Sequence, residues 1–124
     1  DSKIDDGECT MLYAPSTNIL AQNWDWEKEL ESLYVIMKIR YEDGHRITMI
    51  TEPGIIGKIG LNSAGVGVTL NLIAHNPIAK HWGGGGRNRF EGCVPIHVLL
   101  RIGLDSKSAE SGVEAIKCQK RSVA

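Results

Sequence analysis

Three cysteines supply the only thiols of this 124-residue chain, at positions 9, 93 and 118. Their odd number and wide spacing match neither a disulfide framework nor a paired Cys-x-x-Cys metal site. Such cysteine usage favours a reducing compartment. Cys9 stands at the head of an apolar stretch, where a cysteine is either a small buried side chain or, as a thiolate, a nucleophile. Cys9 is therefore the first candidate for chemistry.

The histidines make a weaker case, for a metal site. Cys93 and His97 are four residues apart, a helical spacing, and His75 and His81 lie upstream of them. None of these pairs has the spacing that is typical of a structural zinc site. No metal ion and no other cofactor is predicted.

Four consecutive glycines at 83–86 invite comparison with a phosphate-binding loop. Lys80, Arg87 and Arg89 are near enough in sequence to contact the phosphate groups of a ligand. The segment lacks the GxxxxGK[ST] pattern and its strand-loop-helix setting. A surface loop is the favoured interpretation.

Composition and charge exclude several classes of partner. The chain is 42% hydrophobic with a net charge of -1, which suits one modest domain and provides no basic stripe for nucleic acid or an anionic membrane. No apolar run approaches the roughly 18 residues of a membrane span, and the acidic N-terminus is unlike a signal peptide. We expect an intracellular protein, cytoplasmic or peroxisomal, with no recognisable peroxisomal signal at its C-terminus.

Alternating apolar residues in the first half predict strands. Segments 10–14 and 17–23 read as two short strands around Pro15-Ser16. Segment 33–41 reads as a half-buried strand joined through Asp43-Gly44 to a partner at 46–51. A further strand is expected at 66–73, followed by a loop at 74–92. The alternation places these side chains of segment 33–41 on its buried face: Leu33, Val35, Met37, Ile39 and Tyr41.

Helical spacing replaces this alternation in the second half. Pro95 suits a first helical position, and apolar residues follow at 96, 99 and 100, with Gly103 small enough for close packing. A second helix is indicated by Ala109, Val113 and Ile116, with Ser106 or Ser108 as its N-cap. Strands first and two helices after them predict an α+β fold.

Four stretches in a fixed order carry a family resemblance. They are DGECT at 6–10, QNWDW at 22–26, TEPGIIGKIGLNSAGVGVTLNLI at 51–73 and VPIHVLLRIGLDSKS at 94–108. Together they resemble the acyl-coenzyme A:6-aminopenicillanic acid acyltransferase family, also called the C45 peptidase family, over about nine tenths of the chain. The bile-salt and penicillin V acylases are similar at a greater distance.

The resemblance implies an N-terminal-nucleophile hydrolase with an αββα sandwich, made as a precursor that cuts its own backbone before a cysteine. The partial sandwich expected here has its strands first and two helices after them. The nucleophile is then Cys9, whose freed α-amine serves as the base. Such an enzyme is an amidase or acyltransferase that acts on acyl amides or acyl-CoA thioesters through an acyl-enzyme, and it needs no cofactor.

Further site residues follow from the same motifs. By resemblance Asp25 binds and orients the α-amine, and Asn71 donates to the oxyanion. Gln22, Asn23 and Trp24, which precede the aspartate, are expected to contact substrate. The tryptophans at 24, 26 and 82 can equally be core or pocket-wall aromatics.

The resemblance also predicts the domain organisation. Residues 1–8 are expected to be a remnant of a pro-segment, 9–118 the N-terminal portion of the catalytic domain, and 119–124 a tail. Because the family continues with further strands and site residues, the chain reads as truncated, and its partner would be the rest of its own precursor. The alternatives are an inactive fragment or pseudoenzyme, and an unrelated small α+β binding protein.

Overall fold

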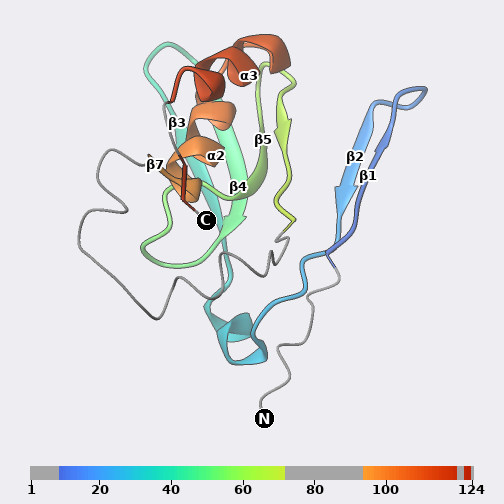
Figure 1. Ribbon diagram of the computed structural model, residues 1–124, viewed down its shortest axis with the longest axis vertical. Helices are drawn as coiled ribbons and strands as arrows, with labels where there is room; N and C mark the ends of the chain where they lie inside the picture. The colour runs from blue at the N-terminus through green and yellow to red at the C-terminus, as the bar shows by residue number, and fades with distance from the viewer. Residues whose placement is uncertain (1–8, 72–93, 120–121, 124) are drawn as a thin grey trace.

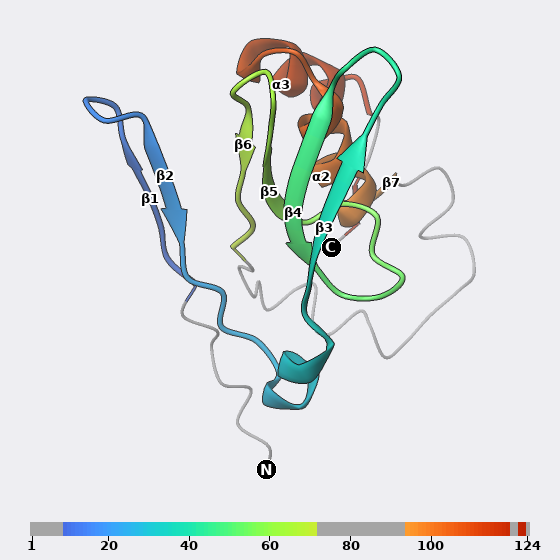
Figure 2. The ribbon, with the colours of Figure 1, turned by 180° about the vertical axis from the view of Figure 1, so that it is seen from behind.

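The computed structural model describes residues 9–71, 94–119 and 122–123. A four-stranded antiparallel sheet, in the order β3-β4-β5-β6, is covered on one face by a helix, and a second helix packs against the first. A separate hairpin stands beside β6 (Figures 1 and 2). This is an α+β arrangement, as predicted. None of the helices in the described part of the chain is long and apolar enough to cross a membrane.

The hairpin consists of β1 (Met11–Ala14) and β2 (Ile19–Gln22), paired antiparallel from Met11 opposite Gln22 to Ala14 opposite Ile19. Asn18 takes φ 54° in the turn, a conformation that Asn tolerates better than most residues, and its Oδ1 accepts from the Tyr13 hydroxyl at 3.1 Å. Both predicted strands are confirmed.

The sheet contains β3 (Val35–Arg40), β4 (Arg46–Thr51), β5 (Ile59–Asn62) and β6 (Gly67–Val68). Strand β4 has the predicted bounds, and Gly44 turns the chain between β3 and β4 with φ 84°, as Asp43-Gly44 predicts. Two expectations need correction. The strand expected at 66–73 is regular only at 67–68 within the described residues, and β5 was not predicted.

The core lies between the sheet and the first helix. Ile47 and Met49 are 1% exposed and Leu104 is fully buried, with Met37 and Ile39 packed against them. The predicted buried face of β3 is thus correct at its centre. It is wrong at the ends, where Leu33, Val35 and Tyr41 are exposed. Leu33 and Tyr41 lie outside the strand, which runs only from Val35 to Arg40.

The helices are α2 (Ile96–Asp105) and α3 (Ala109–Lys117), packed against each other. Pro95 is not the first helical residue as expected. With ψ 143° it stands before the helix, and it lies in β7 (Val94–Pro95), which pairs in parallel with β8 (Ser122–Val123). Ser108 is the N-cap of α3 and accepts from Ser111 N at 3.1 Å, which confirms one of the two predicted caps.

Two glycines let α2 pack closely, Gly57 in the loop before β5 and Gly103 in the helix itself, where it meets the sheet. A Cβ on Gly57 would lie 2.4 Å from the His97 carbonyl oxygen and 2.5 Å from Arg101 N, so no side chain fits there. A Cβ on Gly103 would lie 3.1 Å from Val68 Cγ2, a tight contact that bears out the predicted close packing at this glycine.

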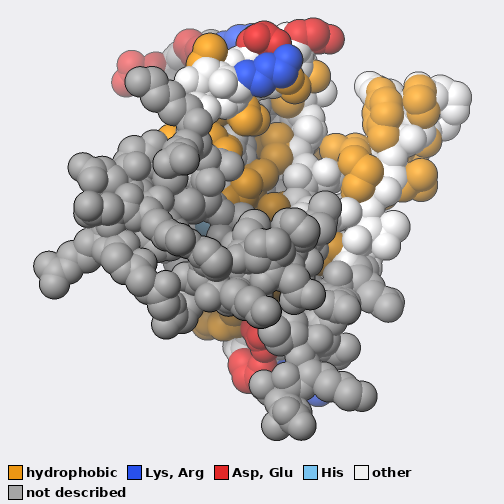
Figure 3. Space-filling view, viewed as in Figure 1, with side chains coloured by type: hydrophobic (Ala, Val, Ile, Leu, Met, Phe, Trp, Pro, Cys, Tyr) orange, Lys and Arg blue, Asp and Glu red, His pale blue; other side chains and the backbone are white. Residues whose placement is uncertain are grey.

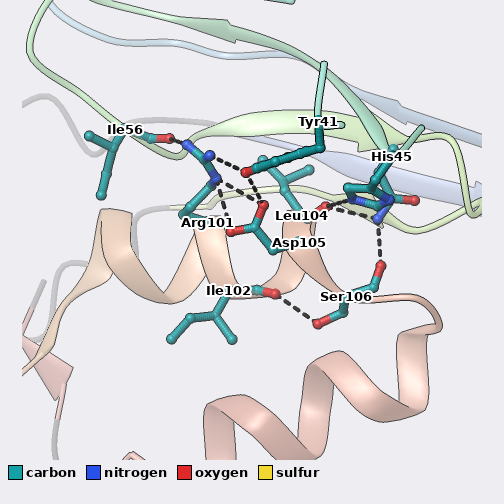
Figure 4. A network of polar contacts seen from close by, with 9 residues as sticks. Tyr41, His45, Ile56, Arg101, Ile102, Leu104, Asp105 and Ser106 are labelled. Carbon is teal, nitrogen blue, oxygen red and sulfur yellow. Dashed lines mark hydrogen bonds and ion pairs between the residues drawn. The ribbon is translucent and has the colours of Figure 1, made fainter. Parts of the chain in front are cut away.

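Buried polar side chains fasten the C-terminus of α2 to the sheet (Figure 4). His45 is 6% exposed, and its Nε2 lies 3.1 Å from the Leu104 carbonyl, which can only accept. Asn62 is 3% exposed, and its Nδ2 donates to the carbonyls of Leu104 at 2.8 Å and Ser106 at 2.7 Å. These bonds satisfy carbonyls that the helix end leaves without intrahelical partners.

A second set of contacts crosses from α2 to the loops (Figure 4). Arg101 pairs with Asp105 at 3.1 Å and donates to the Ile56 carbonyl at 3.0 Å and to the Tyr41 hydroxyl. The same hydroxyl donates to Asp105 at 2.7 Å. Helix, sheet and loop therefore form one packed body.

Candidate functional site

Cys9 lies half-buried just before β1, at the open end of the hairpin. Its Sγ is 3.5 Å from the backbone carbonyl oxygen of Asp25, to which the thiol donates. Two residues that the sequence motifs single out, 16 positions apart, are thus brought together. The contact is made through the main chain of Asp25, which is an exposed residue.

Asn23 extends the hairpin ladder by one pair toward Cys9. Its backbone N–H donates to the Thr10 carbonyl at 3.1 Å, and its side-chain Oδ1 accepts from Thr10 N at 2.6 Å. Side chain and main chain therefore hold the residue that follows the thiol. A shallow open depression on this part of the hairpin is lined by Thr10, Met11, Leu12, Ala21, Gln22 and Asn23.

Gln22 joins the end of β2 to the segment after β6. Its Oε1 accepts from Leu70 N at 2.9 Å, and its Nε2 donates to the Leu70 carbonyl. The same Nε2 donates to Asn71 Oδ1 at 2.7 Å. Asn71, the third motif residue, is thereby attached to the hairpin that carries Cys9.

Trp24 stacks on Trp26, with ring centroids 5.6 Å apart, beneath a buried cation. The Lys58 ammonium lies 4.3 Å from the Trp24 centroid and 5.3 Å from that of Tyr34. Lys58 donates to Glu52, and the two side chains are 3% and 8% exposed. This cluster supports Trp24 as a structural aromatic under the hairpin.

Sequence reasoning missed the buried pair of Glu52 and Lys58. A signal was present, because each is a charged residue within the apolar run TEPGIIGKIG, and a buried charge must be paired. The 3-10 helix η1 (Lys28–Leu33) between Trp26 and Tyr34 was not predicted either.

The alternative sites lie largely outside the described residues. This holds for His75, Lys80, His81, Gly83 to Gly86, Arg87, Arg89 and Cys93. His97 is described, and its Nδ1 lies 2.9 Å from the Gly57 carbonyl, so this nitrogen carries the proton and serves helix packing. Among residues 9–71 and 94–119, no group of three or more His, Cys, Asp or Glu side chains could hold a metal ion.

Comparison with known proteins places the sequence beside an acyltransferase. No protein-family profile matches the chain. Over 113 residues, 90% of this chain, the sequence is 37% identical to the 40 kDa form of acyl-coenzyme A:6-aminopenicillanic-acid-acyltransferase of Emericella nidulans. The aligned residues make up 29% of that protein, so the chain spans less than a third of its relative's length. The similarity shows relatedness to that acyltransferase over this stretch.

Proposed function

We propose that this chain carries the nucleophile of an enzyme that takes acyl groups from acyl amides or acyl-CoA thioesters and passes them to an amine or to water. Cys9 is the nucleophile, Asp25 orients its α-amine and Asn71 donates to the oxyanion. The observation that carries this proposal is the 3.5 Å contact between Cys9 Sγ and Asp25 O, which brings the thiol to the QNWDW segment. The 37% identity to a fungal acyltransferase supports the same class of reaction.

The α-amine becomes available when the peptide bond between Glu8 and Cys9 is cut by the protein itself. A free α-amine has a pKa of about 7.7 to 8.0 and a cysteine thiol one of about 8.5, so the amine can take the thiol proton near neutral pH. The carboxylate of Asp25 would favour the protonated amine. No histidine is required as a base.

The acyl transfer then proceeds in two halves. The thiolate forms a bond to the substrate carbonyl carbon, and the carbonyl π electrons move to the oxygen, where an N–H donor stabilises the charge. The C–N or C–S bond to the leaving group breaks, and that group takes the proton from the α-ammonium. An amine or water next attacks the thioester, gives its proton to the α-amine, and the released thiolate recovers it.

We further propose that the described body is one half of an αββα sandwich, completed by the rest of the precursor. Among the described residues, helices lie on one face of the sheet only (Figure 1). On its other face Ile36 is 70% exposed, Leu61 61% and Ile50 40%. Apolar side chains in adjacent strands support a second sheet as their cover, since sheets that pack face to face bury such residues.

Intact mass of the full-length protein tests the self-processing step. The wild type is expected to yield a chain that begins at Cys9, whereas Cys9→Ala should stay whole and lose acyl release from acyl-CoA and N-acyl amides. Substrate incubated with the processed enzyme should add one acyl mass to the chain that contains Cys9. Cys118→Ala is the matched control, because Cys118 is an exposed free thiol at the C-terminal end of α3, and this variant should be cut and active.

Two outcomes would contradict the proposal. A Cys9→Ala protein that still releases acyl groups would exclude Cys9 as the nucleophile. A wild-type protein that is active while residue 8 is still attached would exclude the α-amine as the base.

A further inference from the structure

The side-chain amide of Gln22 is hydrogen-bonded to the backbone N–H and carbonyl of Leu70, whose donor and acceptor roles are fixed. Leu70 N can only donate, so the Gln22 atom 2.9 Å from it is the oxygen. The Leu70 carbonyl can only accept, so the other terminal atom of Gln22 is the nitrogen. Gln22 thus pairs with Leu70 through both ends of its amide, as a neighbouring strand would.

This pairing determines the orientation of the next amide. One N–H of Gln22 Nε2 is used by the Leu70 carbonyl, and the other points to Asn71 at 2.7 Å. A donor facing Asn71 requires the oxygen of Asn71 there, because two NH2 groups face to face would repel. Asn71 Nδ2 is then on the opposite branch of its amide, and no residue in the described ranges accepts a hydrogen bond from it.

The hairpin also approaches β6 itself, through the apolar side chain of Leu20. A Cβ on Gly67 would lie 2.5 Å from Leu20 Cδ2, so the absence of a side chain at 67 lets β2 come close to β6. Leu20 and Gln22 are two residues apart in β2 and therefore project from the same face. Figure 3 shows the apolar side chains of the hairpin beside the sheet.

We infer that Gln22 is a positioning residue. It hydrogen-bonds to the backbone of Leu70 and fixes the orientation of the Asn71 amide, so that the NH2 group of Asn71 faces the substrate carbonyl. This assignment rests on the proposed function for the role of Asn71. It replaces a substrate contact of Gln22, because both N–H groups of Gln22 have protein partners. The consequence is a link between the hairpin that bears the nucleophile and the donor that stabilises the oxyanion.

Gln22→Glu tests this link with almost no change in shape. A carboxylate cannot donate to Asn71 Oδ1 but accepts from Nδ2, so the Asn71 amide should turn and present its oxygen to the reacting carbonyl. We expect kcat to fall roughly 10² to 10³-fold, as when one oxyanion donor is removed, with KM unchanged. The matched control is Gln119→Glu, the same substitution at a residue whose Nε2 bonds the Ala115 carbonyl, and it should leave kcat unchanged.

A double-mutant cycle separates positioning from a general structural effect. If Gln22 acts through Asn71, Gln22→Glu should cause no further loss of kcat in an Asn71→Ala background. The same loss of kcat in both backgrounds, or no loss in the wild-type background, would overturn the inference. The turnover of Cys9→Ala is measured independently of the Gln22 variants. Failure of the proposed function is thereby distinguished from failure of the role inferred for Gln22.

A measurement on the wild-type protein needs neither activity nor a variant that folds. In NMR spectra both Nε2 protons of Gln22 should exchange slowly with solvent and show NOEs to Leu70 and Asn71. Fast exchange, or NOEs to Asn71 Nδ2 protons alone, would show that the amides are not arranged in this way.

Discussion

The hairpin and the sheet-helix body are stabilised in different ways. In the body, Ile47, Met49 and Leu104 are at most 1% exposed. In the hairpin, Leu12 is 63% exposed and Ile19 55%. The body therefore has an apolar core of its own, whereas the hairpin depends on its ladder and on the contacts of Gln22 and Leu20. An isolated two-stranded hairpin is marginal in water, so the candidate nucleophile is carried by the less stabilised region.

Polar contacts also serve different purposes in the two regions. In the body, His45 and Asn62 close a helix end that already packs on apolar residues. In the hairpin, the amide of Gln22 makes the connection itself. We therefore expect that removing a polar side chain from the body lowers the stability of the fold. Removing one from the hairpin should instead change the geometry of the candidate site.

The largest expected difference in stability between the two regions is that between Leu104 in the body and Leu12 in the hairpin. Leu104→Ala should lower the free energy of unfolding by about 2 to 5 kcal/mol, because it leaves a cavity at a fully buried position. Leu12→Ala should change it by less than about 0.5 kcal/mol. Urea unfolding of both variants makes the comparison, and equal losses would mean that the hairpin is packed as tightly as the body.

A smaller difference is expected between substituting one asparagine in the body and one in the hairpin turn. Asn62→Ala should cost about 1 to 3 kcal/mol, since the buried N–H of Val66 loses the Asn62 Oδ1 that accepts from it at 3.0 Å. Asn18→Gly in the hairpin turn should change stability by less than about 0.5 kcal/mol, because glycine adopts φ 54° readily. Thermal unfolding provides the test, and a greater loss in the Asn18 variant would reverse the comparison.

The smallest effect is a pH dependence at the β3-β4 turn. The backbone N–H of His45 at 2.9 Å, and then Lys107 at 3.0 Å, hold the pKa of Asp43 below its ordinary value of 3.8. The folded state favours the charged carboxylate, so this stabilisation is present above pH 3.8 and is lost as the pH falls through the lower folded-state pKa. Asp43→Asn should lower Tm slightly at pH 7 and not at the acid end.

Glu42→Gln is the control for that turn, because Glu42 is the adjacent exposed acid. Its Tm difference from wild type should show no comparable change between pH 7 and the acid end. A constant difference for Asp43→Asn across that range would mean that the carboxylate charge does not stabilise the turn.

Local patterns predicted the elements whose signals lie within a few residues. The alternation at 46–51 gave β4 its bounds, and Ser108 was one of two predicted caps. Strand β5 was missed because it is short and contains Gly60, whose fit depends on its partner: a Cβ there would lie 2.5 Å from the Thr48 carbonyl. Such a strand is defined by pairing and not by its own sequence.

The candidate site shows the same division. Motifs identified Cys9, Asp25 and Asn71 as residues of interest, and the structure brings the first two within 3.5 Å through the main chain of Asp25. The attachment of Asn71 to Gln22 spans 49 positions and arises from the packing of the hairpin beside β6. No periodicity encodes a contact of that kind. The catalytic roles of these residues stay predictions.

The close approach at Gly57 has a consequence for the history of sequences like this one. A Cβ at 57 would meet the backbone of α2, so any substitution there forces either the loop or the helix to shift. A shift of the helix would displace the carbonyl that His45 and Asn62 both bind. Descendant genes that retain a working product should therefore keep glycine at this position. Among duplicated copies of the gene, loss of this glycine would identify those that are no longer under selection for a folded product.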